Sequence, residues 1–464
     1  MTSQNALPLP IAVIGGGPVG LVAAAHLIAR GLPVKVYEAG PAVGSNIGDW
    51  GHVHVFTPWR YCVDPVATKM LFRRGWRMPE LDSFPTGDEL IRDYVEPLAA
   101  LPELGGVIET GVRVTAISRL GVDKVISRNR EALPFVLVVD TAEGVRRDRA
   151  RGVIDASGTW RTPNPIGAGG LPAEGEELLA DRISYGIPDV LGKHRNLYAD
   201  KTTLVIGSGH SAGNALLDLA RLAQEGPGTT TIWATRSADL SRIYGGGDAD
   251  QLPARGELGF EVRRLAETGR VKLVTGFSTV AIREAVGGII VEGETGDGRT
   301  SIGPIDRIIA ATGQRPDLSL TRELRLELDP WLESAKALGP LIDPNLHSCG
   351  SVPPHGHREL SHPEPGFYTI GIKSYGRAPT FLLLTGYEQA RSVAAALAGD
   401  MIAADDVHLV LPETGVCTTR SKEPQSASAG CCGAPAPVEI NACCIGDADA
   451  KLVEKAGCGC SEAA

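Results

Sequence analysis

Residues Pro10–Gly40 read PIAVIGGGPVGLVAAAHLIARGLPVKVYEAG, and this stretch decides the fold of the first part of the chain. It predicts a strand, a glycine turn, a helix and a second strand. Gly15, Gly17 and Gly20 form a G-x-G-x-x-G motif. In this motif the first glycine permits a tight turn, the second lets the backbone approach a pyrophosphate, and the third lets the helix pack close to the strand. Pro18 lies in the same turn, and we include it among the predicted binding residues.

The acidic residue Glu38 ends the second predicted strand, 18 residues after Gly20. A carboxylate at this place can hold the diol of a ribose, while the phosphates bind to amide groups at the helix N-terminus. The glycine motif alone is a weak signal. Because the strand, the helix and the acid all fall in register, the pattern predicts a dinucleotide site.

A second unit, TTLVIGSGHSAGNALLDLARLAQEG followed by TTTIWATRS, repeats this pattern. Gly207, Gly209 and Ala212 give G-x-G-x-x-A, with Ser211 inside the turn. Where the first unit has a carboxylate, this unit offers Arg236. An arginine suits the 2′-phosphate of NADPH, which a carboxylate would repel. The alternative is an arginine that merely lies at a solvated strand end.

Two further segments, RGVIDASGTW and DRIIAATGQRPD, each predict a strand that ends in a small-residue turn, at Gly158 and Gly313. They flank the second glycine unit. In this arrangement the chain resembles the two-dinucleotide flavoproteins over roughly residues 8–400. The resemblance implies an α/β fold with two Rossmann-like domains, FAD bound at the first turn and NADPH at the second.

The same resemblance implies that the second domain is inserted in the first, and a cysteine-rich C-terminal tail follows them. The predicted divisions are an FAD-binding domain in two parts, a connection, an NADPH-binding domain and a flexible tail: 1–165, 166–196, 197–303, 304–405 and 406–464. Within the last folded part we expect a strand at Phe367–Gly371 and a helix from about Thr380 to Ala398, which in this family lies under the flavin.

The composition is globular: the 464 residues are 43% hydrophobic and 22% charged. The net charge of −10 argues against binding to nucleic acid or to an anionic membrane. There is no run of about 18 apolar residues, so we expect no transmembrane helix. The N-terminus, MTSQNALPLP, lacks the basic region and apolar core of a signal peptide. We therefore expect a cytoplasmic protein whose thiols are reduced.

The absence of a cysteine pair limits which reactions a flavin in this protein can support. Disulfide reductases of this family carry C-x-x-x-x-C after the first nucleotide unit, but here that region has only Cys62, and residues 197–303 have no cysteine. A flavin without a dithiol passes its electrons to oxygen or directly to a substrate. The segments GSNIGDW and GSGHSA resemble class B monooxygenases, and the resemblance implies that Trp50 lies over the flavin.

Two features depart from that class. The expected F-x-G-x-x-x-H fingerprint before the second unit is replaced by ISYGIPDVLGKHRNLYADK. The usual G-D near the end of the flavin domain is also missing, since Gly371 is followed by Ile372. The contact with the ribityl chain of FAD must therefore differ from the contact in the family.

Candidate catalytic residues come from two predicted loops that each combine an aromatic side chain with an arginine. Trp59 and Arg60 lie in PWRY, and Tyr375 and Arg377 lie in KSYGRAP. An arginine there can stabilise negative charge that develops during oxygen transfer. For each of the four, the alternative is a role in packing or in a surface ion pair.

The C-terminal tail groups cysteines in pairs. Adjacent cysteines make strained disulfides, and the C-x₂₋₄-C spacing of zinc sites is absent. Paired thiolates suit soft thiophilic ions such as trivalent arsenic, Hg(II), Cu(I) or cadmium. The alternatives are a tail without a ligand, zinc, or an iron–sulfur cluster. The predicted ligands are Cys431, Cys432, Cys443, Cys444, Cys458 and Cys460.

A second cluster of soft ligands lies in the loop NLHSCGSVPPHGHRELSH. It holds His347, Cys349, His355, His357 and His362. We consider two interpretations of this loop: a metal or arsenical site, or a surface or cofactor-covering loop with scattered histidines. The thiol of Cys349, like that of Cys62, is also a candidate for handing a thiophilic substrate to the flavin.

Three segments and the tail together resemble a more specific group. SNIGDWGHVHVFTPWRYCVDP, NLHSCGSVPPHGHREL and KSYGRAPTFLLLTGYEQARSV, with the CCG…CC…CGC tail, resemble flavin-dependent monooxygenase-like proteins of bacterial arsenic-resistance operons. The resemblance implies that O₂ oxidises a small-molecule substrate, a trivalent arsenical. Two alternatives remain: a monooxygenase acting on sulfur or nitrogen of a metabolite, and an NADPH-dependent metal-ion reductase. The sequence leaves the oligomeric state open.

Overall fold

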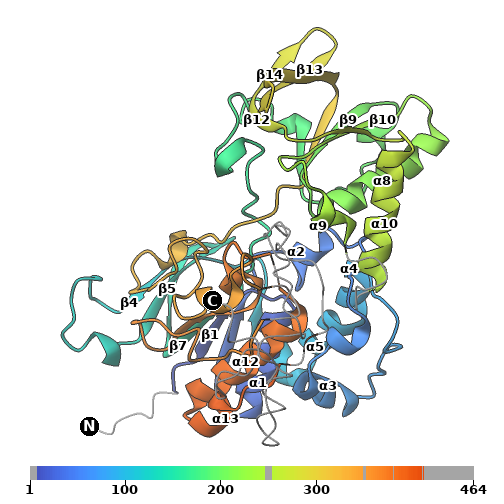
Figure 1. Cartoon of the computed structure of the whole chain (residues 1–464). Helices are drawn as coiled ribbons and strands as arrows, with labels where there is room; N and C mark the ends of the chain where they lie inside the picture. Colours follow the sequence, from blue (N-terminus) through green and yellow to red (C-terminus); the bar gives the residue numbers. More distant parts are fainter. Residues whose placement is uncertain (1–7, 246–252, 348–351, 380, 410, 412–464) are drawn as a thin grey trace, which may run out of the picture. The chain divides into compact units, whose positions relative to one another are not determined.

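The computed structural model describes residues 8–245, 253–347, 352–379, 381–409 and 411 (Figure 1). Its first sheet is entirely parallel and has the order β16-β7-β1-β2-β3. The central strand β1 is fully buried, as expected for a parallel sheet that is covered on both faces. The strands are β1 Ile11–Ile14, β2 Val34–Tyr37, β3 Ile108–Glu109, β7 Gly152–Asp155 and β16 Phe367–Thr369.

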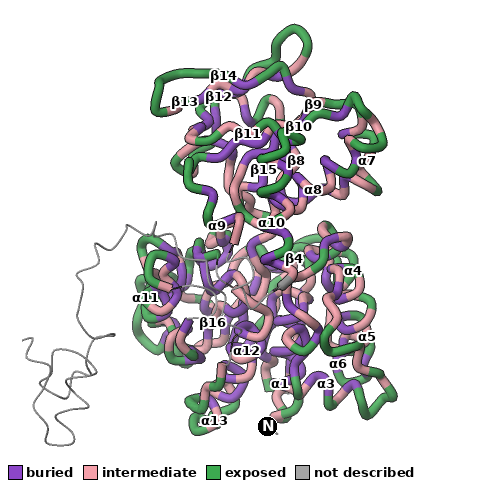
Figure 2. The backbone as a smooth tube through the Cα atoms, turned by 45° about the vertical axis from the view of Figure 1, so that its right-hand side comes forward, coloured by how far each residue is buried: buried purple, intermediate pink, exposed green. Residues whose placement is uncertain are grey.

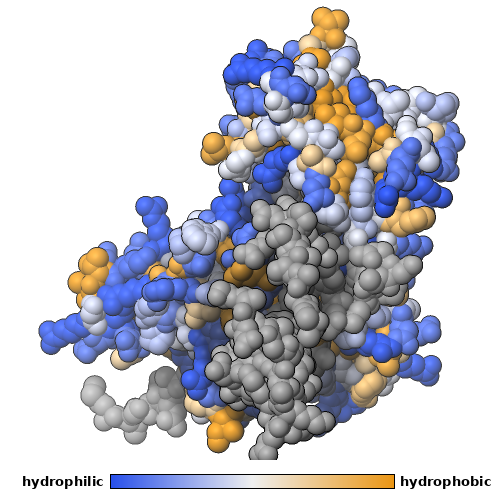
Figure 3. Space-filling model, in the orientation of Figure 1, coloured by the Kyte–Doolittle hydropathy of each residue, from blue (hydrophilic) through white to orange (hydrophobic). Residues whose placement is uncertain are grey.

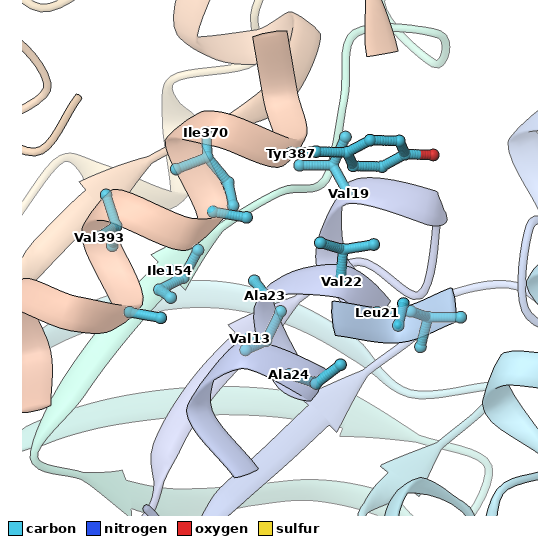
Figure 4. Close-up of a cluster of buried hydrophobic side chains, with 14 of the residues drawn as sticks. Val13, Val19, Leu21, Val22, Ala23, Ala24, Ile154, Ile370, Tyr387 and Val393 are labelled. Carbon is cyan, nitrogen blue, oxygen red and sulfur yellow. The ribbon is translucent and has the colours of Figure 1, made fainter. Parts of the chain in front are cut away.

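Two helices, α1 (Pro18–Ala29) and α12 (Leu383–Ala398), pack against each other on one face of this sheet. Their apolar side chains share one core with Val13 of β1 and Ile154 of β7. Figure 4 shows α1 and α12 contributing side chains to this cluster. The predicted helix near the end of the folded part is thus present, although it begins at Leu383, three residues after the expected start.

The opposite face of the first sheet is covered by an antiparallel sheet of order β4-β5-β6. Side chains from both sheets share a second core, in which Ile14 and Val153 meet Phe135 and Leu137. This β-sheet layer completes the burial of β1 and β7. Its strands are β4 Arg113–Arg119, β5 Phe135–Thr141 and β6 Gly144–Ala150.

The second glycine unit forms its own parallel sheet of order β11-β10-β9-β15-β8. Helices α8 (His210–Glu225) and α10 (Pro253–Glu267) contact each other, and side chains of both share a core with β9 and β10. The strands are β8 Ile183–Tyr185, β9 Thr202–Ile206, β10 Thr230–Ala234, β11 Lys272–Val274 and β15 Arg307–Ala310.

A three-stranded antiparallel sheet, β12-β13-β14, packs on the strands β9 and β15. In Figure 2 the outer turns of these hairpins are exposed and drawn green. The strands are β12 Ser278–Ala285, β13 Gly288–Thr295 and β14 Gly298–Ile305. The sheets confirm the predicted α/β class with two Rossmann-like units, the second inserted between β7 and β16 of the first.

The second sheet includes β8 and β15, which lie outside the predicted range 197–303. The sheet of the second unit therefore extends beyond the predicted limits at both ends. The remaining helices are short: α2 Ser45–Gly48, η1 Trp59–Tyr61, α3 Pro65–Phe72, α4 Gly87–Leu90, η2 Ile91–Val95, α5 Glu96–Ala99, α6 Pro102–Gly105, η3 Arg130–Ala132, η4 Ala168–Gly170, η5 Ala180–Arg182, α7 Arg195–Tyr198, α9 Ser241–Tyr244, η7 Ser319–Thr321, α11 Gly339–Ile342, η8 Gly371–Tyr375 and α13 Met401–Asp405.

The visible surface of the described residues in Figure 3 is mainly hydrophilic, and its largest apolar group lies between the places that Figure 1 labels β12 and β9. Val280 and Val286 are exposed there. Scattered exposed apolar side chains are ordinary for a globular protein. Within the described ranges, no helix combines the length and the hydrophobicity needed to cross a bilayer.

One buried ion cluster joins the two parts of the first unit. Glu364 accepts hydrogen bonds from Arg119 and Arg130, at 2.7 and 2.9 Å, and from the backbone N–H of Arg325. All three charged side chains are at most 2% exposed. Burial raises the pKa of Glu364, but the hydrogen bonds outweigh this effect and lower it. The stabilisation is therefore lost as the pH falls.

We expect Glu364→Gln to lower the free energy of unfolding by about 3–5 kcal/mol, because it leaves two buried arginines without their counter-charge. Urea denaturation of both proteins measures the change. Glu327→Gln is the matched control, since Glu327 pairs with Lys336 at the surface and is 53% exposed. The control should change the free energy of unfolding little. Equal stability of the Glu364 variant and the wild type would contradict a structural role for the cluster.

Candidate functional site

The first glycine turn is built by close contacts between backbone segments. Gly15 has φ +107°, and a Cβ there would lie 2.5 Å from the carbonyl oxygen of Ala156. A Cβ at Gly20 would collide with the carbonyl oxygen of Gly15. Both positions therefore require glycine, which brings the N-terminus of α1 against the end of β1.

The middle glycine has a different environment. A Cβ added at Gly17 meets no described atom within 4 Å. Gly17 is the N-cap of α1, so free amide groups of the first helical turn lie beside this open space. The turn thus leaves room for a group that the helix N-terminus can bind, and a pyrophosphate fits that requirement.

The carboxylate of Glu38 closes the other side of this turn. Its two oxygens accept hydrogen bonds from the backbone N–H groups of Gly16 and Gly40, at 2.7 and 2.6 Å. The side chain is half-buried at the end of β2. Its place at the carboxyl edge of the sheet, next to the glycine turn, is the place of the residue that holds a ribose in Rossmann units.

The second turn repeats this geometry. Gly207 has φ +132°, and a Cβ there would collide with the carbonyl oxygen of Ala311, which follows β15 as Ala156 follows β7. A Cβ at Gly209 meets no described atom within 4 Å. Ala212 is fully buried at the third motif position. The two turns therefore have the same combination of close packing and open space.

Other predicted residues of the second site lie at its edges. Ser211 is half-buried in the first turn of α8. Arg236 is exposed just after the end of β10, and no ion pair to it is found among the described residues. Gly158 and Gly313 have φ values of +74° and +83° at the turns after β7 and β15. Their role as binding residues stays a prediction.

An aromatic pair lies beside the first site. The rings of Trp50 and Trp160 have centroids 6.5 Å apart. The indole N–H of Trp160 donates to Asp49 at 2.9 Å, and Arg161 pairs with the same carboxylate at 3.1 Å. The segment that carries the predicted residue Trp50 is thus tied to the turn after β7. Trp160 ends the segment RGVIDASGTW, of which the sequence analysis selected only Gly158.

The predicted catalytic residues Trp59 and Arg60 differ in exposure. Trp59 is 3% exposed and packs in the core shared with α1. Arg60 forms an ion pair with Asp82, and both side chains are largely exposed. The packing and ion-pair alternatives considered for these residues therefore have structural partners, and their catalytic role stays a prediction.

The second pair shows the same contrast. Tyr375 is fully buried, with its hydroxyl 3.4 Å from Nε2 of His355. Arg377 is 39% exposed and forms a two-bond ion pair with Glu333, at 2.8 and 3.1 Å. Trp59 and Tyr375 belong to the same hydrophobic core, whereas Arg60 and Arg377 pair with different surface carboxylates. Their role in catalysis also stays a prediction.

A buried ion pair that sequence reasoning missed lies at the carboxyl edge of the first sheet. Lys373 donates to Asp155 at 2.7 Å and to the hydroxyl of Ser157 at 3.0 Å. Lys373 is 2% exposed and Asp155 is fully buried. The pair joins the turn after β7 to the segment η8 after β16. The 218 residues between the partners leave no local sequence signal.

The histidine-rich loop forms structural contacts where it is described. His355 is buried, and His357 pairs with Asp405 at 2.7 Å. Nδ1 of His362 lies 3.2 Å from the carbonyl oxygen of Glu327. Across the described part of the chain, no three His, Cys, Asp or Glu side chains are grouped as metal ligands. Cys349 lies outside the described residues, so the predicted site there is only partly covered.

The thiol of Cys62 is fully buried. Burial raises its pKa to about 11, although the hydrogen bond with Thr57 acts in the opposite direction. At neutral pH the thiol is therefore protonated, and a protonated thiol is a poor nucleophile and metal ligand. The six predicted tail ligands, from Cys431 to Cys460, lie outside the described residues.

Comparisons with known proteins agree with this geometry. Residues 13–64 match the family model of an NAD(P)-binding Rossmann-like domain. Thiamine thiazole synthase from Pyrobaculum neutrophilum is 29% identical over 243 residues, which cover 50% of this chain and 86% of that protein. Both the family model and this relative cover only part of the chain.

Solved structures cover more of the chain. Bacillithiol disulfide reductase from Bacillus cereus has a TM-score of 0.62 and 18% identity, covering 84% of this chain and 99% of that one. A variant of the flavin monooxygenase from Stenotrophomonas maltophilia has a TM-score of 0.56 and 21% identity, covering 84% and 98%. The chain therefore has the fold of the two-dinucleotide flavoprotein oxidoreductases, with an NAD(P)-binding Rossmann-like domain at residues 13–64.

Proposed function

We propose that this protein is an FAD- and NADPH-dependent monooxygenase whose substrate is a trivalent arsenical. The observation that carries the proposal is the pair of open glycine turns, at Gly17 and Gly209, in a structure whose described residues include a single cysteine, Cys62. Two dinucleotide sites support hydride transfer from one cofactor to the other. Without a dithiol, the electrons pass to oxygen or to the substrate.

The residues of the first turn fit FAD. The open space at Gly17 faces the amide groups of α1, and Glu38 lies at the end of the neighbouring strand β2. In FAD, the pyrophosphate and the adenosine ribose need these two partners. In the second turn Arg236 replaces the carboxylate, and its exposed guanidinium suits the 2′-phosphate of NADPH.

The burial of Cys62 favours a reaction with oxygen over electron transfer through thiols. Cys62 is the only cysteine in the segment that follows the first nucleotide unit, its side chain is fully buried, and its pKa is raised to about 11. A thiol relay needs an accessible thiolate and a second cysteine. The likeness to bacillithiol disulfide reductase is a likeness of fold and does not supply these groups.

Bound FAD would accept a hydride from NADPH and supply the electrons that activate O₂ for oxygen transfer to the substrate. The chain itself holds the pyrophosphates at the two helix N-termini, and Trp50 and Trp160 shield one side of the first site from water. For an arsenical the reaction balances as R–As(OH)₂ + O₂ + NADPH + H⁺ → R–AsO(OH)₂ + H₂O + NADP⁺. One oxygen atom enters the substrate and the other leaves as water.

The choice of an arsenical rests on the sequence. The segments FTPWRY, HSCG and KSYGRAPTFLLLTGYEQ and the paired tail cysteines resemble proteins of arsenic-resistance operons. Neighbouring thiolates bind trivalent arsenic, so a cysteine-rich arm linked to the enzyme raises the local concentration of substrate. Oxygenation of sulfur or nitrogen in a metabolite is the alternative for the same cofactor sites. Reduction of a captured metal ion without oxygen transfer is the other.

Gly17→Val should give a folded but colourless protein. A Cβ at this position meets no described atom within 4 Å, so we expect the added side chain to conflict with the pyrophosphate rather than with the fold. Flavin absorbance and circular dichroism measure the two properties. Gly209→Val is the matched control, since it fills the equivalent space of the second turn. It should keep the yellow colour and lose NADPH oxidation. A Gly17 variant that retains stoichiometric FAD would refute the assignment of the first turn.

Arg236→Asp should raise KM for NADPH by about 10- to 100-fold, because a charge-assisted contact becomes a repulsion. KM for NADH should change little, since NADH has no 2′-phosphate. Steady-state NADPH and NADH oxidation measure both values. Arg299→Asp makes the same charge change on β14, where the side chain is 88% exposed, and should leave both values unchanged. Equal effects of Arg236→Asp on the two cofactors would show that Arg236 does not contact the phosphate.

Trivalent arsenicals should stimulate NADPH oxidation with one O₂ consumed per NADPH, as the balanced reaction requires. An oxygen electrode and a panel of arsenicals, sulfides and amines test this. NADPH oxidation without oxygen consumption would instead favour a metal-ion reductase. Stimulation by sulfides or amines alone would favour the metabolite alternative.

A chain ending at Thr414 should keep its turnover at saturating arsenical and lose turnover at low arsenical if the tail captures substrate.

A further inference from the structure

The order of the first sheet indicates where the second half of a bound dinucleotide lies. Glu38 follows β2 and Gly17 follows β1, so the ribose and pyrophosphate sites are adjacent along the carboxyl edge. The sheet continues from β1 to β7 and β16. A dinucleotide held at the first two points therefore directs its remaining half toward the turns after β7 and β16. This step rests on the proposed function.

The turn after β16 begins at Gly371. Its φ is +72°, a conformation that favours glycine, and a Cβ there would lie 3.5 Å from the side chain of Val19. Val19 lies in the first turn of α1, two residues after Gly17. Gly371 is thus next to the helix end that binds the pyrophosphate. Ile372 follows it, so the acidic residue expected here in the family is absent.

A buried polar network holds Gly371 from the side of α12. The backbone N–H of Gly371 donates to Oε1 of Gln389 at 2.8 Å. The hydroxyl of Ser374 donates to the carbonyl oxygen of Gly371 at 2.8 Å, and Nε2 of Gln389 donates to Ser374 at 3.0 Å. Gln389 is fully buried and Ser374 is 2% exposed. Both backbone groups of Gly371 are therefore fixed by buried side chains.

The orientation of the Gln389 amide depends on His355. Nδ1 of His355 lies 2.9 Å from the carbonyl oxygen of Pro353, which can only accept, so this nitrogen carries a proton. In the neutral ring Nε2 is then an acceptor. It lies 3.1 Å from Nε2 of Gln389, which donates to it. The neutral ring thus directs the amide nitrogen toward His355 and leaves Oε1 for Gly371.

A second proton on His355 would reverse these roles. Nε2–H would then face the donor group of Gln389 at 3.1 Å, and a rotation of the amide by half a turn would turn this donor–donor contact into a hydrogen bond. The Tyr375 hydroxyl, 3.4 Å from Nε2, is the more distant alternative acceptor. That rotation would place the amide NH₂ against the N–H of Gly371, two donors facing each other. Protonation of His355 therefore breaks the hydrogen bond at Gly371.

We propose that Gln389 is a positioning residue of the FAD site: its amide fixes the backbone of Gly371, and it takes its orientation from the neutral ring of His355. Gln389 and His355 compensate for the acidic side chain that is absent at Ile372, because they hold the backbone of Gly371 in place. The glutamine and histidine do not touch the cofactor in this arrangement; they act through the backbone of Gly371.

The surroundings of His355 favour the neutral ring. The groups around it that carry or can carry charge are Tyr375 of η8, Glu388 of α12 and Glu359 of its own loop. Burial lowers the pKa of His355, against smaller effects of the Pro353 carbonyl and the two carboxylates. The folded protein therefore keeps the network above the ordinary pKa of histidine and loses it as the pH falls below that value.

Gln389→Met tests the hydrogen bond. Titration of FAD-free protein with FAD, followed by flavin fluorescence, gives the dissociation constant. We expect it to rise about tenfold, the usual effect of leaving one buried hydrogen-bonding group without its partner. Ser392→Ala is the matched control: Ser392 is also fully buried on α12, but it bonds His357 and Ala404. The control should keep wild-type FAD affinity.

Gln389→Glu distinguishes positioning from general packing. A carboxylate accepts from Gly371 and also from a protonated His355, so it favours the charged ring. In the wild type the affinity for FAD should fall as the pH decreases below the ordinary histidine pKa of about 6.5, because burial lowers the pKa of His355. In Gln389→Glu the affinity should not fall over the same range, because the carboxylate accepts from Gly371 whether or not His355 is protonated. A role in packing alone would leave the pH dependence unchanged.

The outcomes separate this inference from the proposed function. The role of Gln389 is overturned if the wild type and Gln389→Glu show the same pH dependence, or if Gln389→Met binds FAD as tightly as the wild type. Neither result contradicts the FAD site itself. If Gln389→Met does not fold, the pH profile of Gln389→Glu decides alone. A wild-type protein that never binds FAD overturns the proposed function, and this inference with it.

Discussion

The close contact between Gly15 and Gly20 is the constraint on which the first site depends. Helix α1 can begin at the end of β1 only because no side chain separates the two backbones. This contact aims the free amide groups of α1 at the space beside Gly17 and places α1 where α12 can pack on it. The open turn and the position of α1 beneath α12 thus depend on one approach of backbone to backbone.

The second unit shows which parts of this arrangement are required. Gly207 and Gly209 repeat the close contact and the open space, but the third motif position accepts the methyl group of Ala212. The acidic residue at the end of the second strand is replaced by Arg236. The turn geometry is thus shared by the two units, whereas the residues around it set which cofactor chemistry each one suits.

The glycine turns and the order of strand, helix and strand could be predicted because they are local: each needs about 30 consecutive residues of one unit. Strand β8 has only three residues and no local signature, and its pairing with β15 depends on residues more than a hundred positions away. The same reason explains why the ion-pair alternative considered for Arg60 and Arg377 came without named partners. Their partners, Asp82 and Glu333, lie outside the motifs that drew attention to the arginines.

The Gly371 network was beyond sequence analysis for a related reason. Gln389 is one polar residue within a largely buried helix, and His355 lies in a loop whose histidines suggested metal binding. Only the folded chain shows that the amide and the ring meet behind Gly371. The missing acidic residue after Gly371 was the one local sign that this turn is held differently.

The insertion of one unit into the other also orders events during synthesis. All five strands of the second sheet lie between Ile183 and Ala310, so this unit is complete when the ribosome reaches that point. The first sheet still lacks β16, and α1 still lacks its partner α12. Domains usually fold from the N-terminus onward as they emerge. Here the later unit can fold first, and the earlier half remains an open sheet with an uncovered helix until the last folded residues are made.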